Sequence, residues 1–163
     1  MNADDGLRGD APIGDDAPLT VVRELYQASP LDVWRAFEDP AAIEQWWAPG
    51  GTVVETAQVE LHPGGALRVL SRGRGLTFEV LGTVSAAERL CSFTTTWSWA
   101  QADPVLAAGT SGEVTVTLES LSSTAAGTRV TVQHTGLQGE QRQRNAEGWA
   151  RALEGLQEYL EQA

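Results

Sequence analysis

The chain contains no lysine, and all 11 of its basic residues are arginines. Without a lysine amine the chain cannot form a Schiff base with a carbonyl substrate or with pyridoxal phosphate, and it cannot supply the lysine of a phosphate-binding P-loop. It also lacks a G-x-S-x-G nucleophile elbow and a G-x-G-x-x-G dinucleotide fingerprint after a predicted strand. These absences leave carboxylates, histidine, tyrosine and serine as the groups available for catalysis.

Cysteine and histidine are nearly as scarce, with one cysteine and two histidines in 163 residues. A single cysteine cannot form an internal disulfide, which fits the reducing cytoplasm where we expect this protein to reside. The three side chains are too few for a four-ligand zinc site. Because no metal, nucleotide or haem signature is present, we expect no cofactor.

Positive charge is in the minority, since 22 acidic residues against 11 arginines give a formal net charge of −11. This balance disfavours nucleic acid and anionic membranes as partners, because both attract clustered cations. No apolar run approaches the roughly 20 residues that span a bilayer. The acidic opening MNADDGLRGDAPIGDDAP lacks the apolar core of a signal peptide. We predict a disordered tail over residues 1–17 and a single domain over residues 18–163.

The domain begins with signals for one strand and two short helices. The segment LTVVRELYQA predicts the strand. In SPLDVWRAFEDP, Ser29 is a predicted N-cap, Pro30 occupies the first helical position, and apolar residues recur at helical spacing. Asp39 and Pro40 repeat this signal, so a second short helix is predicted to end at the glycines of WWAPGG.

The middle of the chain is rich in valine, threonine and aromatic residues, and turn signals such as HPGG and RGRG divide it. One segment alternates Val114, Val116 and Leu118 with polar residues, as an antiparallel sheet with one buried face does. The predicted strands are TVVETAQVEL, ALRVLSR, LTFEVLGTV, RLCSFTTTWSW, EVTVTLES and TRVTVQH.

A long helix is predicted for the C-terminal segment GEQRQRNAEGWARALEGLQEYLEQA. Gly148 and Gly155 are poor helix formers that lie seven residues apart on one face, so they predict a close approach of the helix to the sheet. The whole order indicates an α+β fold, in which a curved antiparallel sheet of six to seven strands surrounds the helix and leaves a cavity. The apolar stripe of this helix consists of Trp149, Leu153, Leu156 and Leu160.

The segment SPLDVWRAFEDPAAIEQWWAPGG resembles the opening of bacterial single-domain proteins of the SRPBCC superfamily. These are START-like, helix-grip proteins, and the similar branch is named after activators of a heat-shock chaperone ATPase. Later Pro-Gly-Gly, Arg-Leu, Gly-Thr, His-Thr-Gly and Gly-Trp motifs agree in order, so the likeness extends over residues 19–160. It implies the helix-grip fold and a hydrophobic cavity. The matching residues of the opening are Pro30, Val33, Trp34, Ala36, Asp39, Pro40, Trp46, Trp47 and Pro49.

The resemblance places Trp46 and Trp47 at the end of the second short helix, with one ring in the core and the other at the rim of the cavity. Alternation in RLCSFTTTWSW puts Cys91 on the same face as its apolar neighbours, so we expect a buried, inert thiol. His134 should also point inward, either as a hydrogen-bonded core residue or as a ligand contact, whereas His62 should be exposed in a turn.

Two further pairs have two interpretations each. Arg142 and Asn145 precede Trp149 by seven and four residues, so they either overhang the cavity entrance or lie in solvent. Glu55 and Arg68 either form a cross-sheet pair or lie on a wet face. The candidate ligand-binding residues are Trp47, Phe78, Phe93, Thr95, Trp97, Trp99, Val116, His134, Arg142, Asn145, Trp149 and Leu153.

Non-catalytic binding of a hydrophobic or aromatic small molecule is the function that these features favour, because no nucleophile lies beside a base. A chaperone-ATPase partner is an alternative that the resemblance implies, although only the acidic tail precedes the domain. Relatives in the superfamily also include polyketide cyclases and enediyne self-resistance proteins. Abundant arginine without lysine indicates a high-GC bacterium, where such clusters are common, and Gly109 and Gly112 would then be candidate scission sites.

Overall fold

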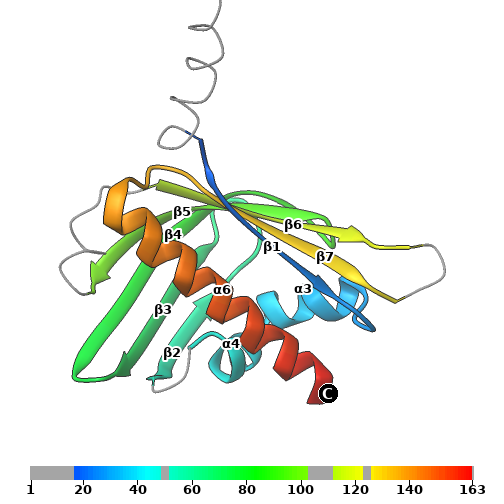
Figure 1. Cartoon of the computed structure of the whole chain (residues 1–163), viewed down its shortest axis with the longest axis horizontal. Coiled ribbons are helices and arrows are strands. Elements are labelled where there is room, and N and C mark those ends of the chain that lie inside the picture. The colour runs from blue at the N-terminus through cyan, green and yellow to red at the C-terminus, as the bar shows by residue number, and fades with distance from the viewer. Residues whose placement is uncertain (1–16, 49–51, 103–111, 123–125, 163) are drawn as a thin grey trace, which may run out of the picture.

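In the described part of the chain the order of elements agrees with the sequence: one strand, two short helices, six strands and one long helix (Figure 1). A computed structural model describes residues 17–48, 52–102, 112–122 and 126–162, so the predicted tail lies outside the described residues except for Ala17. The elements are β1 (Leu19–Leu25), α3 (Pro30–Glu38), α4 (Pro40–Trp46), β2 (Thr52–Val59), β3 (Ala66–Gly73), β4 (Leu76–Glu88), β5 (Ser92–Gln101), β6 (Gly112–Ser120), β7 (Thr128–His134) and α6 (Gly139–Gln162).

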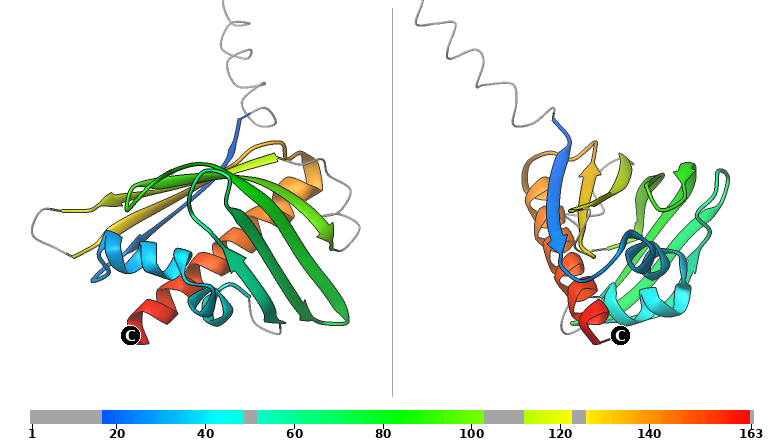
Figure 2. Two further views of the ribbon diagram at one scale, coloured as in Figure 1. Left: turned by 180° about the vertical axis from the view of Figure 1, so that it is seen from behind. Right: turned by 90° about the vertical axis from the view of Figure 1, so that its right-hand side faces the viewer.

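The seven strands form one antiparallel sheet in the order β1-β7-β6-β5-β4-β3-β2. The first two strands of the chain are thus the two edges of the sheet, and α3 and α4 carry the chain from one edge to the other. Irregular pairing of β4 with β5 between Val84 and Ala86, and of β2 with β3 between Val54 and Thr56, adds to the curl of the sheet. The sheet curves around α6, which makes this a helix-grip fold (Figure 2).

The short helices begin where side-chain caps satisfy their free N–H groups. The Ser29 hydroxyl accepts from the backbone N–H of Asp32 at 3.1 Å, and the Ser29 N–H donates to the Asp32 carboxylate at 3.0 Å. Asp39 ends α3 and caps α4, since its carboxylate accepts from the Ala41 N–H at 3.0 Å. The predicted N-caps are confirmed.

The C-terminal half of α6 lies in the main core. Leu153 and Leu156 are fully buried, and the helix packs there on α3, α4 and β1. Leu160 of the predicted stripe is only partly buried, because the last turn extends past the edge of the sheet (Figure 1).

The two glycines of α6 have different surroundings, and neither is pressed against the sheet as predicted. A Cβ atom added to Gly155 would lie 2.6 Å from the carbonyl oxygen of Trp46, so the close approach is to the end of α4. A Cβ atom added to Gly148 would meet nothing within 4 Å. Position on one helix face was therefore insufficient to identify the neighbouring element.

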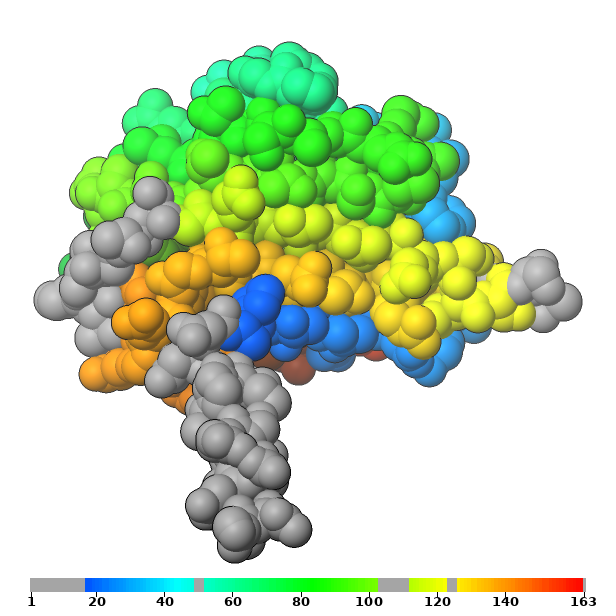
Figure 3. All heavy atoms as spheres, turned by 90° about the horizontal axis from the view of Figure 1, so that it is seen from above, coloured from blue at the N-terminus to red at the C-terminus, as the bar shows by residue number. Residues whose placement is uncertain are grey.

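The outer face of the sheet carries two groups of charged side chains, and its strands lie as successive bands in Figure 3, from β1 through β7 and β6 to the green strands. Of the two interpretations of Glu55 and Arg68, the exposed face is confirmed and a pair between the two is not formed. Glu55 pairs with Arg72 at 3.2 Å, and Arg68 pairs with the buried carboxylate of Glu79 at 2.6 Å. The register of β3 between β2 and β4 decides these partners, and strand alternation alone does not reveal it.

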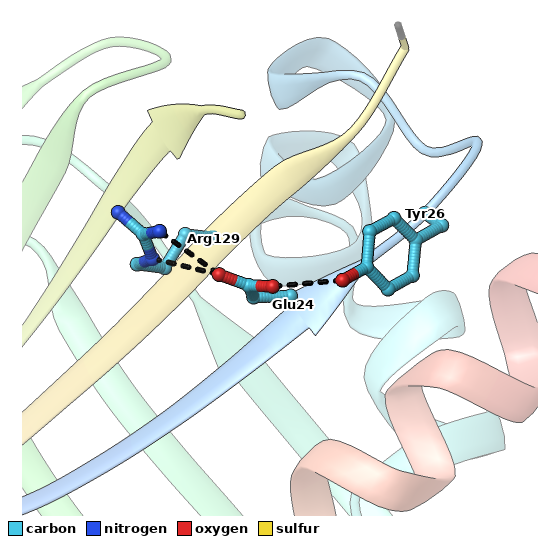
Figure 4. A network of polar contacts seen from close by, with 3 residues as sticks. All are labelled: Glu24, Tyr26 and Arg129. Atoms are coloured by element: carbon cyan, nitrogen blue, oxygen red, sulfur yellow. Dashed lines mark hydrogen bonds and ion pairs between the residues drawn. The ribbon is translucent and has the colours of Figure 1, made fainter. Parts of the chain in front are cut away.

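A second outer cluster joins β1 to β7 (Figure 4). The Glu24 carboxylate accepts from the Arg129 guanidinium at 2.9 and 3.2 Å and from the Tyr26 hydroxyl at 2.8 Å. The hydrogen bond from Tyr26, and then the one from Arg129, lowers the pKa of Glu24 below its usual 4.5. The same bond to Glu24 raises the pKa of Tyr26 above 10.0.

Candidate ligand-binding cavity

A cavity of about 210 Å³ lies between the N-terminal half of α6 and strands β3, β4 and β5. It is smaller than the roughly 300–1,000 Å³ of pockets for drug-sized ligands, so a compact molecule fits it best. The lining residues are Trp47, Thr52, Val69, Ser71, Arg74, Phe78, Val80, Trp97, Trp99, Arg144, Asn145, Glu147, Gly148, Trp149, Arg151 and Ala152.

Four tryptophans from three separate segments form the aromatic part of the wall. The ring centroid of Trp97 lies 5.8 Å from that of Trp47, 5.1 Å from that of Trp149 and 6.2 Å from that of Trp99. These are the separations and tilted or edge-to-face angles that aromatic rings prefer. The rings therefore support one another and offer a ligand a preformed apolar surface.

The adjacent tryptophans at the end of α4 have different environments, as the resemblance implied. Trp46 is 2 % exposed, donates its indole N–H to the Ala36 carbonyl at 2.9 Å, and packs against Phe37. Trp47 is only partly buried and reaches the cavity. One ring thus completes the core and the next forms part of the wall.

His134 lies behind the wall, at the end of β7, and is 1 % exposed. Its Nδ1 accepts the indole N–H of Trp149 at 3.1 Å, so the neutral ring carries its proton on Nε2. Burial lowers the pKa of His134 to about 4. The predicted inward orientation is confirmed, and His134 acts as the acceptor that fixes the orientation of Trp149. Its contact with a ligand stays a prediction.

Two indole nitrogens in the wall have no hydrogen-bond acceptor among the described residues. The Nε1 atoms of Trp97 and Trp99 are buried without a partner in this part of the chain, whereas those of Trp46 and Trp149 are satisfied. A buried donor without an acceptor costs about 1–3 kcal/mol. Such donors are concentrated at this site, which is a common property of functional sites.

The rim of the cavity is polar. Arg144, Glu147 and Arg151 are exposed on α6, one turn apart, and Gly148 lies between them without a side chain. Arg74 lines the same cavity from the turn between β3 and β4, where its φ angle is 54°. Arg144 also approaches Glu140 at 3.8 Å. The rim thus carries three guanidinium groups and one carboxylate.

Half of the predicted ligand-binding residues lie on this wall. Sequence reasoning missed the rim: the seven-residue spacing of Arg144 and Arg151 was a usable signal, but nothing local connects Arg74 to α6. The predicted residues on the wall are Trp47, Phe78, Trp97, Trp99, Asn145 and Trp149.

The other predicted residues lie elsewhere. Phe93 and Val116 line a second cavity of about 10 Å³, which has room for roughly one water molecule. Thr95 and Leu153 are buried outside both walls, as is His134.

Of the predicted residues Arg142 and Asn145, only Asn145 lines the cavity. The Arg142 guanidinium donates to the carbonyls of Ala17 and Pro18 at 2.8 and 3.3 Å, so it fastens the start of β1 and is not on the wall. Asn145 lines the cavity, and its side-chain amide donates to the Gln141 carbonyl at 2.8 Å.

The prediction of a buried Cys91 is wrong, because its side chain is exposed. Strand β5 begins only at Ser92, and Leu90 takes a φ angle of 70° in the turn before it. The alternation that correctly buries Phe93 and Trp97 therefore does not extend back to Cys91. His62, in contrast, is exposed as predicted.

Of the two candidate scission sites, Gly109 lies outside the described residues. Gly112 begins β6, and a Cβ atom there would lie 2.1 Å from the carbonyl oxygen of Thr135. The close packing of two backbones is sufficient reason for a glycine at this position.

Two searches of the described residues gave negative results. No group of three or more histidine, cysteine, aspartate or glutamate side chains within them is placed to hold a metal ion. No helix in the described part of the chain is both long enough and apolar enough to cross a membrane.

Solved structures share this architecture over nearly the whole chain. A protein from Rhodobacter sphaeroides is 24 % identical, with a TM-score of 0.74 and coverage of 90 % of this chain and 93 % of its own. The AHSA1 protein from Silicibacter pomeroyi is 24 % identical, with a TM-score of 0.72 and coverage of 88 % and 97 %. CalU16 from Micromonospora echinospora is 21 % identical, with a TM-score of 0.61 and coverage of 86 % and 74 %. At these identities the likeness defines the fold.

The family follows from the sequence itself. Residues 27–161 match the family model described as activator of Hsp90 ATPase homolog 1-like protein, and the chain belongs to this family. The bacterial neighbours in structure agree with this assignment. A comparison with curated protein sequences found no match.

Proposed function

We propose that this protein binds a compact hydrophobic or aromatic small molecule, without chemical turnover, in the cavity between the sheet and α6. The observation that carries the proposal is the aromatic wall formed by Trp47, Trp97, Trp99 and Trp149 around about 210 Å³ of space. Protein interiors are normally packed without voids of this size. A cavity retained among four large side chains is thus a candidate binding site.

The polar groups of the wall support binding rather than catalysis. Its hydroxyls belong to Thr52 and Ser71, and no histidine, cysteine or tyrosine is among the lining residues. The exposed Glu147 is the only carboxylate of the described wall, and Gln143 donates to it at 3.3 Å. A nucleophile activated by an adjacent base, as covalent catalysis requires, is not present within this set.

Thermal unfolding with a ligand panel tests the proposal. The panel contains compact bicyclic aromatics, fatty acids and aromatic polyketides, since these differ in size but share apolar surface. A ligand at about 100 times its Kd stabilises the folded state by roughly 2.7 kcal/mol. For a domain of this size that is a rise in Tm of roughly 5–10 °C. Isothermal titration calorimetry then gives the stoichiometry, and we expect one site per chain.

Gly148 provides a matched pair of variants that localises binding. Gly148→Leu puts a side chain at the open rim of the cavity, where an added Cβ meets no atom within 4 Å, so the fold is retained. Gly148→Ala adds only a methyl group and is the control. We expect the leucine to abolish ligand binding and the alanine to preserve it. Equal binding by both variants would place the ligand outside this cavity.

The family description favours one other function, that of a partner of the Hsp90 ATPase. The measurement is the ATPase rate of purified Hsp90 with and without this protein. An increase that survives in Gly148→Leu would assign the activity to the outer surface. No change in the rate would remove this second candidate.

A further inference from the structure

We infer that the ligand of this cavity is an aromatic acid: a compact apolar ring system that carries a carboxylate. The inference rests on the proposed function and adds a chemical class to it. The apolar body would lie against the tryptophans, and the carboxylate would lie at the rim formed by α6 and the turn between β3 and β4.

The charge of the rim is the first argument. Only 11 of the 33 charged residues of the chain are basic, and its formal net charge is −11. At the cavity the balance is reversed, since three of the four charged residues of the described wall are arginines and only Glu147 among them is acidic. Clefts with an excess of one sign of charge concentrate ligands of the opposite sign.

The position of the arginines is the second argument. Arg144 and Arg151 lie seven residues apart on one face of α6, and Arg74 faces the cavity from the opposite side. Arg151 forms no hydrogen bond or ion pair with the described residues, so its guanidinium is available to a ligand. Guanidinium binds carboxylate through two parallel hydrogen bonds, which a neutral ligand cannot reproduce with equal strength.

The size of the cavity limits the ligand. About 210 Å³ is below the range of pockets that enclose a drug-sized molecule. A one- or two-ring acid fits this space with its charged group outside, in contact with water and the rim. Burial of the carboxylate itself is avoided, which matters because a buried unpaired charge is very costly.

The experiment compares 2-naphthoate with 2-naphthamide, which have the same shape but different charge, by isothermal titration calorimetry. We expect the acid to bind at least about tenfold more tightly, as two charge-assisted hydrogen bonds imply. In Arg151→Gln the acid should lose about 1.5- to fivefold in affinity, the usual range for an exposed ion pair. Binding of the amide should be unchanged in this variant.

Arg35→Gln is the matched control. Arg35 is exposed on α3, so this substitution removes the same charge at a position away from the cavity. Equal losses in Arg35→Gln and Arg151→Gln would show a general charge effect and overturn the inference. Equal affinities of acid and amide for the wild type would also overturn it, while cavity binding would stand. If neither compound nor any other member of the panel binds, the proposed function fails as well.

Discussion

The two halves of α6 have different surroundings. The C-terminal half is close-packed: Leu153 and Leu156 are fully buried, and Gly155 touches the Trp46 carbonyl. The N-terminal half and the first residues after the midpoint, from Arg144 to Ala152, cover a cavity, and the rim residues Arg144 and Arg151 are exposed. One continuous helix thus has two roles. Its close-packed half stabilises the fold, and the half that covers the cavity is the part available for binding.

Leu156→Ala should give the largest effect, because it removes a fully buried side chain from the close-packed half. We expect a loss of about 2–5 kcal/mol in the free energy of unfolding, measured by urea denaturation. Arg151→Ala, at an exposed position on the rim of the cavity, is the counterpart and should change the same quantity by less than about 0.5 kcal/mol. Similar losses for both variants would show that the halves do not differ in packing.

His134 connects the open half to the sheet, and its titration should make stability depend on pH. The pKa is about 4 in the folded protein and 6.5 in the unfolded chain, so the unfolded chain binds the proton first as the pH falls. Stability is therefore complete above pH 6.5, decreases between 6.5 and 4, and levels off below that. The full decrease amounts to on the order of 3 kcal/mol.

The measurement is urea denaturation at several pH values for the wild type and for His134→Asn. Asparagine does not titrate, and its side-chain oxygen can accept the indole N–H of Trp149 in place of Nδ1. The carboxylates add the same pH dependence to both proteins. We therefore expect the two curves of unfolding free energy to diverge between pH 6.5 and pH 4. The same substitution at the exposed His62 is the matched control. Parallel curves for wild type and His134→Asn would contradict the assignment.

The two glycines provide a direct comparison of the halves, because substitution by alanine should change the free energy of unfolding in opposite directions at the two positions. Gly155→Ala should destabilise by about 1–3 kcal/mol, since the new methyl group meets the Trp46 backbone at 2.6 Å. Gly148→Ala should stabilise by up to about 1 kcal/mol, because alanine is the better helix former and nothing obstructs it. Calorimetry gives the Tm of each variant and of the wild type. A higher Tm for Gly155→Ala than for the wild type would mean that α4 moves easily.

Arg129→Gln should have the smallest effect, because its ion pair with Glu24 lies on the outer face, away from both halves of α6 (Figure 4). Exposed pairs contribute little and are screened by salt. The lowered pKa of Glu24 means that its contribution is present at neutral pH and disappears as the pH falls through the acid range. We expect a Tm change smaller than those of Leu156→Ala and Gly155→Ala, and a loss as large as that of Gly155→Ala would be incompatible with this description.

The elements were predictable because their signals are local. Ser29 and Asp39 cap the short helices through bonds to residues two or three positions away, and strand alternation buries Val114 and Val116 as expected. The error at Cys91 has the same origin, since one turn residue in the left-handed region ended the alternation.

The cavity was only partly predictable because its wall is assembled from distant segments. Trp97 and Trp149 were found through the apolar faces of their own elements. Arg74 faces α6 only because the sheet curls, and the curl depends on register shifts between strands. The predicted neighbour of Gly155 was wrong for the same reason: a residue's own element does not specify which neighbour packs against it.

The aromatic wall also has an optical consequence. All six tryptophans of the chain belong to one succession of ring contacts, which runs from Trp34 through Phe93 and Phe37 to Trp46 and on to the cavity. Excitation energy passes readily between indoles at such short separations. Trp34 contacts only Phe93 in this succession, and phenylalanine absorbs at too high an energy to accept excitation from tryptophan. Light absorbed by any of the other five tryptophans therefore reaches the rings at the cavity, and a molecule seated there that accepts this energy would quench the fluorescence of these five.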